Sequence, residues 1–151
     1  MNRGLPEGVR QILYAVLAMA ALPAGAQTQD PYAGLSDSQL DGIRSAFYRA
    51  ADSMEATMGA IRSMEAELAG PAASWPLVAR AYRASLEGLI GKHHPSLMEK
   101  FRRVNASLDA WRGLVEAAPL SLELRFLRYS FFLQLPGIFG VGSYLEPDRK
   151  A

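Results

Sequence analysis

The sequence predicts an all-α fold, with about four helices in one domain that follows an N-terminal export signal. Three observations predict this class. Apolar residues recur at steps of three and four over long stretches of the chain. Serines stand where helix N-caps are expected, and Pro or Gly follows each periodic stretch. We find no alternation of apolar and polar residues long enough to indicate a β-strand.

Residues 1–26 have the pattern of a cleavable signal peptide. A positively charged start is followed by an uncharged apolar run, a proline and a small-x-small cleavage site. The apolar run is shorter than the roughly 20 residues of a membrane span. We therefore expect an exported protein, periplasmic or secreted, with no stable membrane span after cleavage. The pattern consists of Arg3 and Arg10, the apolar run 12–22, and the cleavage residues Ala24, Ala26 and Gln27.

The rest of the chain is predicted to form a tether (27–35), a single helical domain (36–145) and a flexible tail (146–151). The whole chain has 16 Lys and Arg against 15 Asp and Glu, and signal removal takes two Arg and one Glu. The remainder is formally neutral, which argues against a nucleic-acid partner. The sequence contains no Cys, so disulfides and zinc-thiolate sites are excluded.

The first helix of the domain is expected to be long. Ser36 and Gln39 have the spacing of a capping box at its start. An apolar stripe then continues without interruption from Leu40 to Leu68, which predicts one helix of about nine turns. Gly70 and the proline after it end the stripe.

Three shorter helices follow in this interpretation. One covers about 76–90, and the next begins after Ser96 and ends before Pro119, with Leu97 as the first of its inward positions. The last helix, 122–135, has Ser121 as its predicted N-cap. It is apolar nearly all round, which predicts that it is buried.

Two stretches between residues 75 and 135 have large and small residues at regular spacing, the first beginning at Trp75 and the second containing Trp111, Leu114 and Pro119. These stretches resemble tetratricopeptide repeats, which are helix–turn–helix units. Large residues in that family act as knobs, while small residues let a neighbouring helix approach closely. The resemblance implies a helical hairpin packed against the long first helix. The matching residues are Trp75, Val78, Ala79 and Tyr82 for the first helix of a repeat, and Trp111, Leu114 and Pro119 for the second.

A second resemblance concerns residues 123–128 and the Leu135-Pro136 pair that follows them. This segment is similar to the C-terminal end of a group of small exported bacterial proteins. The resemblance implies the same helical class and brings no activity with it.

No catalytic motif, cofactor motif or specific metal motif is found. His93 and His94 are the only histidines, and they are weak candidates for metal ligands because adjacent residues do not share one helix face. We expect them in an exposed connector. The sequence therefore predicts neither a cofactor nor a metal.

Arg125 and Arg128 lie three residues apart on an otherwise apolar helix. Arginine is seldom buried without a partner. One interpretation is structural, with both side chains pairing with Glu123, Glu116 or Asp109 to join the last two helices. The other is functional, with both at the edge of a groove that holds a carboxylate or a peptide terminus.

These observations together favour a non-catalytic module that binds a protein or peptide partner in the envelope or outside the cell. The expected groove lies between the second and fourth helices, with Tyr82, Trp111, Arg125 and Arg128 as candidate binding residues. One alternative is a small-ligand or lipid binder that uses the aromatic residues of the last helix. Another is a weak or accessory hydrolase.

Overall fold

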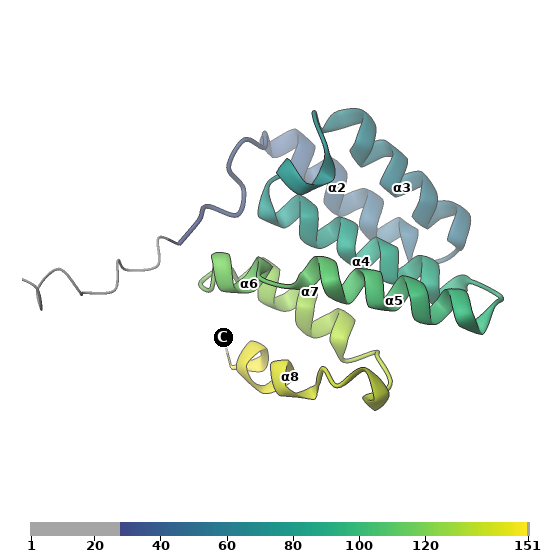
Figure 1. Cartoon of the computed structure of the whole chain (residues 1–151). Helices are drawn as coiled ribbons and strands as arrows, with labels where there is room; N and C mark the ends of the chain where they lie inside the picture. The colour runs from purple at the N-terminus through teal and green to yellow at the C-terminus, as the bar shows by residue number, and fades with distance from the viewer. Residues whose placement is uncertain (1–27, 151) are drawn as a thin grey trace, which may run out of the picture.

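The computed structural model describes residues 28–150 (Figure 1). The predicted signal peptide and the cleavage residues Ala24, Ala26 and Gln27 lie outside the described residues. The described part of the chain consists of helices and connectors without a strand, which confirms the all-α prediction. Its elements are α2 (Asp37–Ala50), α3 (Met54–Glu67), η1 (Ala72–Ser74), α4 (Leu77–His93), α5 (Leu97–Trp111), α6 (Leu114–Ala117), α7 (Leu122–Phe132), η2 (Gly137–Phe139) and α8 (Gly142–Arg149).

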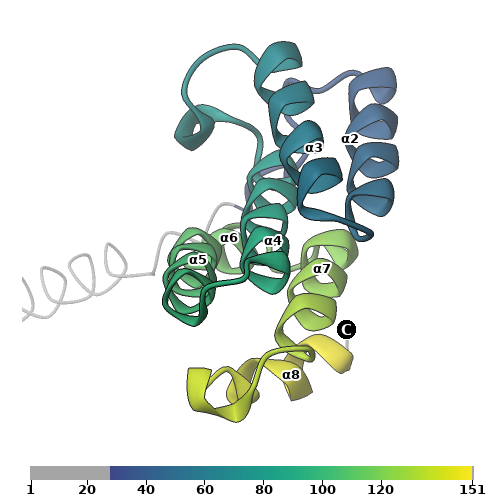
Figure 2. The same cartoon turned by 90° about the vertical axis from the view of Figure 1, so that its right-hand side faces the viewer.

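Helix α4 is the centre of the fold. It contacts α2, α3, α5, α6 and α7, and Figure 2 shows α5 on one side of it and the α2–α3 pair on the other. Small residues on several faces of α4 allow this close approach from several directions. Those that are buried are Ala79, Ala81, Ala84, Ser85, Gly88 and Gly91.

The prediction of a single long first helix was wrong, because α2 and α3 are two helices joined by a short turn. Ser53 caps α3 by accepting a hydrogen bond from the backbone N–H of Ala56 (3.1 Å). The buried Thr57 hydroxyl lies 2.8 Å from the carbonyl oxygens of both Ala50 and Ser53, which fixes the turn. Both helices direct apolar side chains at the same core, so the apolar spacing continues across the break.

The predicted third helix is also divided. Helix α5 ends at Trp111, and Gly113 adopts a left-handed conformation with φ of 77° before the short helix α6. Glycine takes this conformation without the steric cost that a Cβ would impose. With these two breaks, the expected four helices become five helices of eleven residues or more in residues 28–150, with shorter pieces between them.

The last predicted helix was expected to be buried on nearly all sides, but part of its surface is exposed. Leu124 and Leu127 of α7 are buried, whereas Phe126 and Leu133 are exposed. The helix that is buried on most sides is therefore α4. Its many small side chains give it a less apolar sequence than that of α7. Within residues 28–150, none of the helices combines the length and the hydropathy needed to cross a bilayer.

The segment expected as a tether lies against the domain. The backbone N–H of Gln29 donates to the carbonyl of Ala117 (2.9 Å), and that of Val78 donates to the carbonyl of Pro31 (3.0 Å). Tyr32 also packs on the core. Residues 28–35 are thus part of the fold.

The expected flexible tail, 146–151, also differs from the structure. Helix α8 begins before it, at Gly142, and continues to Arg149. Asp148 within this helix is 7% exposed. The helical domain therefore extends past residue 145, and α8 packs on α7 (Figure 2).

The predicted helix starts are confirmed where a serine marks them. Ser36 forms the full capping box with Gln39. The Ser96 and Ser121 side chains each accept a hydrogen bond from the backbone N–H of the third residue in the helix that follows. Local hydrogen-bonding preferences thus fix these three helix boundaries.

Gly88 is required for the close packing of α4 against α7. A Cβ at this position would clash with the ring of Phe131 and lie 3.3 Å from Oγ of Ser107. Gly59 of α3 offers a matched comparison, because a Cβ there has only Arg62 within reach, at 4.0 Å.

We expect Gly59→Ala to stabilise the protein by up to about 1 kcal/mol through helix propensity. Gly88→Ala is expected to be less stable than Gly59→Ala by about 1–3 kcal/mol, measured by urea unfolding. Equal stability of the two variants would contradict this account.

Candidate interaction site

Tyr82 belongs to a hydrogen-bonded cluster around Glu123. Its hydroxyl donates to Oε1 of Glu123 (2.7 Å), and the hydroxyl of Tyr32 donates to Oε2 (2.9 Å). Arg44 donates to both carboxylate oxygens, from Nε at 2.9 Å and from Nη2 at 2.6 Å. The cluster joins the N-terminal segment, α2, α4 and α7 through one carboxylate.

The charge of Glu123 is stabilised by these donors. Burial alone would raise the pKa of Glu123, but the hydrogen bonds from Arg44, Tyr82 and Tyr32 outweigh burial and hold the pKa below its usual value. Burial, together with the neighbouring Glu123 carboxylate, raises the pKa of Tyr82. The cluster is internally satisfied, so Tyr82 has a structural part in this protein.

Arg128 is held by two carboxylates. Its Nε and Nη2 atoms donate to Oδ2 and Oδ1 of Asp148 (2.7 and 2.8 Å), and Nη1 donates to Oε1 of Glu116 (2.8 Å). The guanidinium also lies 5.0 Å from the centre of the Tyr144 ring. Burial lowers the pKa of Arg128, but the bonds to Asp148 and Glu116 outweigh it, and the net shift is upward. The structural interpretation thus accounts for the contacts of Arg128.

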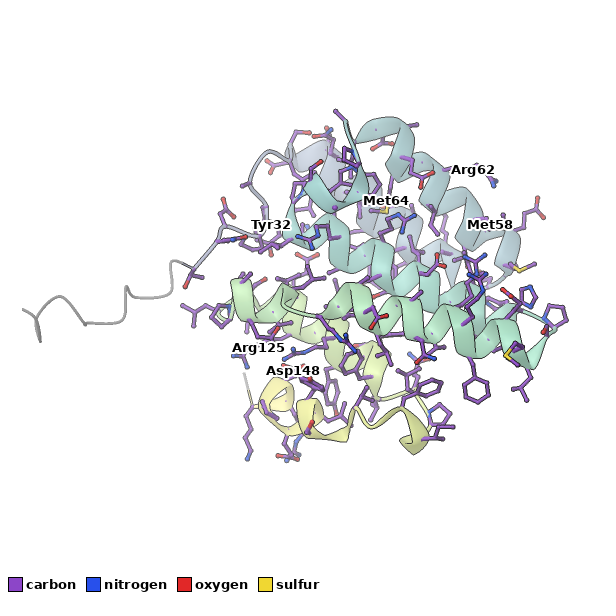
Figure 3. All side chains as sticks on the ribbon, viewed as in Figure 1. Tyr32, Met58, Arg62, Met64, Arg125 and Asp148 are labelled. Atoms are coloured by element: carbon purple, nitrogen blue, oxygen red, sulfur yellow. The ribbon has the colours of Figure 1, made fainter. Side chains whose placement is uncertain are left out.

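Arg125 makes backbone contacts instead of ion pairs. Its Nε donates to the carbonyl of Pro119 (2.6 Å) and its Nη1 donates to the carbonyl of Pro147 (3.0 Å). Figure 3 labels Arg125 and Asp148 in the region where α7 meets α8. Both arginines therefore join α8 to the rest of the domain.

Trp111 is 2% exposed and packs edge-on against Phe132. No acceptor for its indole N–H is found in the described part of the chain. Trp111 and Arg128 line a cavity of about 450 Å³ that also includes Tyr144. Tyr82 instead lies in the Glu123 cluster, so the four predicted binding residues do not line one groove.

The two histidines have separate backbone partners. Nε2 of His93 lies 3.1 Å from the carbonyl oxygen of Ala51, and Nδ1 of His94 accepts a hydrogen bond from the N–H of Ser96 (3.1 Å). These contacts connect the end of α4 to the α2–α3 turn and to the start of α5. Over residues 28–150 no cluster of three His, Cys, Asp or Glu side chains is arranged to hold a metal ion.

A different feature has the geometry of a binding site. An apolar groove of about 360 Å³ lies between α4, α5 and the segment 131–139. Gly88 and Gly91 of α4 belong to its lining, with Phe131 packed closely against Gly88 and α5 packed closely against Gly91. The other lining residues are Leu89, Lys92, Leu97, Lys100, Phe101, Val104, Phe131, Gln134, Leu135, Pro136, Ile138 and Phe139. We call this feature the α4–α5 groove.

Large apolar side chains at the α4–α5 groove are open to solvent. Leu97 is 68% exposed and Ile138 is 73% exposed, and the neighbouring Met98 is 77% exposed. Phe101 and Phe139 pack on each other below them, with ring centres 5.6 Å apart. Exposed apolar side chains that gather at one groove are a feature of interaction surfaces.

The charges at the groove are positive. Lys92 and Lys100 line it, and neither lysine has an ion-pair partner among the residues that the structure describes. The nearby acids are already paired. Glu99 accepts from Arg102 at 2.6 Å, and Glu87 pairs with Arg103. The groove therefore carries two uncompensated positive charges.

Comparisons with family models, curated proteins and solved structures gave no match for this chain. The resemblance to tetratricopeptide repeats stays a prediction. Its first-helix residues are buried, but Trp75 precedes α4, whereas Val78, Ala79 and Tyr82 belong to it. Its second-helix residues do not share one helix, because Trp111 ends α5 and Leu114 begins α6.

Spacing alone could not separate the groove residues from the core. Leu97 lies on the apolar face of α5, where the spacing predicts a buried residue, but no neighbouring element covers it. The pair Gly88 and Gly91 inside a helical stretch was an available signal, because glycine in a helix interior costs stability and indicates a close approach.

Proposed function

We propose that this chain is a non-catalytic binding module that holds a segment of a partner protein in the α4–α5 groove. The observation that carries the proposal is the set of exposed apolar side chains at an apolar groove, Leu97, Met98 and Ile138. We further propose that the module acts outside the cytoplasm, on the basis of the signal-peptide pattern in residues 1–26.

The shape of the groove favours a partner segment over an enclosed ligand. Its volume of about 360 Å³ is near the lower end of the roughly 300–1,000 Å³ of small-molecule pockets, which bury most of the ligand surface. Leu97 and Ile138 extend out of the groove into solvent. A partner that crosses the groove would cover both side chains, whereas a ligand inside it would leave them exposed.

The test uses a display library of 16-residue random peptides, selected on the full domain. We expect selected peptides to bind the wild-type protein and to bind Leu97→Asp and Ile138→Asp at least about tenfold more weakly, because a charge would face the apolar contact. Isothermal titration calorimetry measures the affinities. Both residues are exposed in the free protein, so the substitutions leave the core unchanged.

The matched control is Phe126→Asp. Phe126 is also a large exposed apolar residue, on α7, and it does not line the α4–α5 groove. Its substitution is expected to leave peptide affinity within twofold. If all three variants bind equally well, the selected peptides use another surface and the proposal fails.

A second candidate is a ligand with an acyl chain. The aromatic lining from Phe101, Phe131 and Phe139 favours it. Native mass spectrometry of the purified protein distinguishes the two candidates. A bound lipid that Ile138→Asp removes, together with no selected peptide, would favour the second candidate over the first.

A further inference from the structure

We infer that the segment which occupies the α4–α5 groove is an amphipathic helix with acidic residues beside its apolar face, placed to meet Lys92 and Lys100. This inference rests on the proposed function and adds the chemistry of the partner.

Two lysines from different helices line the groove. Lys92 lies in the last turn of α4 and Lys100 in the first turn of α5, so each helix contributes one positively charged residue. The arginines near them, Arg102 and Arg103, already have carboxylate partners. Opposite charge at an interface favours association and fixes the orientation of the partner. Carboxylates on the partner would supply that opposite charge.

The groove is partly open to solvent along α4 and α5, and its lining is mostly apolar. Three phenylalanines, Phe101, Phe131 and Phe139, belong to this lining. Large side chains of a partner can enter there. An amphipathic helix presents such side chains in a row, at positions i, i+3, i+4 and i+7.

The fold argues against an extended partner. Strand addition needs an exposed sheet edge with free backbone N–H and C=O groups. Residues 28–150 contain no strand, so the groove offers no sheet edge to an extended segment. A helix with its own backbone hydrogen bonds satisfied is therefore the better occupant.

The N-terminal segment of the chain itself is a poor occupant. It offers an apolar run, 12–22, but the charges before the run include Arg3 and Arg10. These charges have the same sign as Lys92 and Lys100, and like charges repel at an interface. The charge pattern thus favours an acidic segment of another protein.

The test reverses the charge of the groove. Peptides are selected from the same display library on the wild-type domain and on the Lys92→Glu/Lys100→Glu variant. We expect wild-type selection to enrich acidic residues within one turn of the apolar anchors, and selection on the variant to enrich basic residues there. A wild-type-selected peptide should bind the variant at least about tenfold more weakly. Replacing its acidic residues with Lys should restore binding to the variant.

The control is Arg49→Glu/Arg62→Glu, which makes the same change in net charge. Arg49 and Arg62 are exposed residues of α2 and α3, and Figure 3 labels Arg62 on α3. Neither residue lines the α4–α5 groove. This variant should bind the wild-type-selected peptides with unchanged affinity.

Three results would overturn the inference. Peptides without an acidic bias, or with equal affinity for the charge-reversed variant, would show that the lysines do not select the partner. The proposed function would still stand if Leu97→Asp weakened the same peptides. Binding to vesicles of anionic phosphatidylglycerol, with no peptide selected, would identify a membrane surface instead and overturn both proposals.

Discussion

Replacing Arg128 with methionine is expected to lower the free energy of unfolding by about 3–5 kcal/mol, because it leaves a buried carboxylate without its counter-charge. Arg128 is 6% exposed and Asp148 is 7% exposed. The Asp148 carboxylate accepts both of its side-chain hydrogen bonds from this one guanidinium. Urea unfolding followed by circular dichroism measures the loss.

Two further variants test whether the buried charge is the cause. Arg149→Met removes an exposed partner of Glu146 in the same helix and should cost less than about 1 kcal/mol. The double variant Arg128→Met/Asp148→Leu removes both charges, and it should recover much of the stability that Arg128→Met loses. A loss below about 1 kcal/mol for Arg128→Met would contradict the account, as would a double variant less stable than the single one.

Replacing Glu123 with glutamine is expected to cost about 2–3 kcal/mol at pH 7, since hydrogen bonds to a charged group are stronger than neutral ones. The effect should depend on pH. The pKa of Glu123 is lowered in the folded protein from an ordinary value of 4.5. Its contribution to stability is therefore complete above pH 4.5 and is lost as the pH falls through the lower, folded pKa.

The measurement compares wild type and Glu123→Gln by urea unfolding at several pH values between 7 and 3. The difference in unfolding free energy should stay constant above about pH 5 and narrow below it. Glu65→Gln provides the control, because Glu65 forms only a surface pair with Arg83 at 3.4 Å. A difference that stays the same down to pH 3 would show that the charge of Glu123 is not the source of its effect.

Local structure could be predicted well from the sequence. The helix starts at Ser36, Ser96 and Ser121 depend on hydrogen bonds within four residues, so the sequence contains the whole signal. The break between α2 and α3 was missed although Ser53 caps α3 in the same way. An uninterrupted apolar period concealed it, because two helices on one core share that period.

Long-range pairing could not be predicted in this way. The pairing of Arg128 with Glu116 was among the expected partners, but the pairing with Asp148 was not. Asp148 lies in a charged, proline-containing stretch that has the composition of a solvated tail. Its burial follows from the docking of α8 on α7, which no local pattern encodes.

The four predicted binding residues do not line one groove, for a related reason. Apolar spacing identifies which face of a helix is apolar, but it does not say whether another element covers that face. Leu97 and Trp111 lie on one apolar face of α5, yet Trp111 is buried and Leu97 is exposed. Tyr82 was a candidate from the resemblance to tetratricopeptide repeats, and Arg128 was one because it is an arginine on an otherwise apolar helix. In the structure the side chains of both residues join helices.

The placement of Asp148 also bears on how the chain matures during synthesis. Ribosomes deliver the chain from its N-terminus, so Arg128 is synthesised after one of its carboxylate partners, Glu116, and before the buried one, Asp148. A chain that ends at Leu145 holds every helix from α2 to α7, but it lacks the carboxylate that accepts two of the hydrogen bonds of Arg128. The docking of α8 on α7 therefore completes the set of partners that lets this arginine be buried.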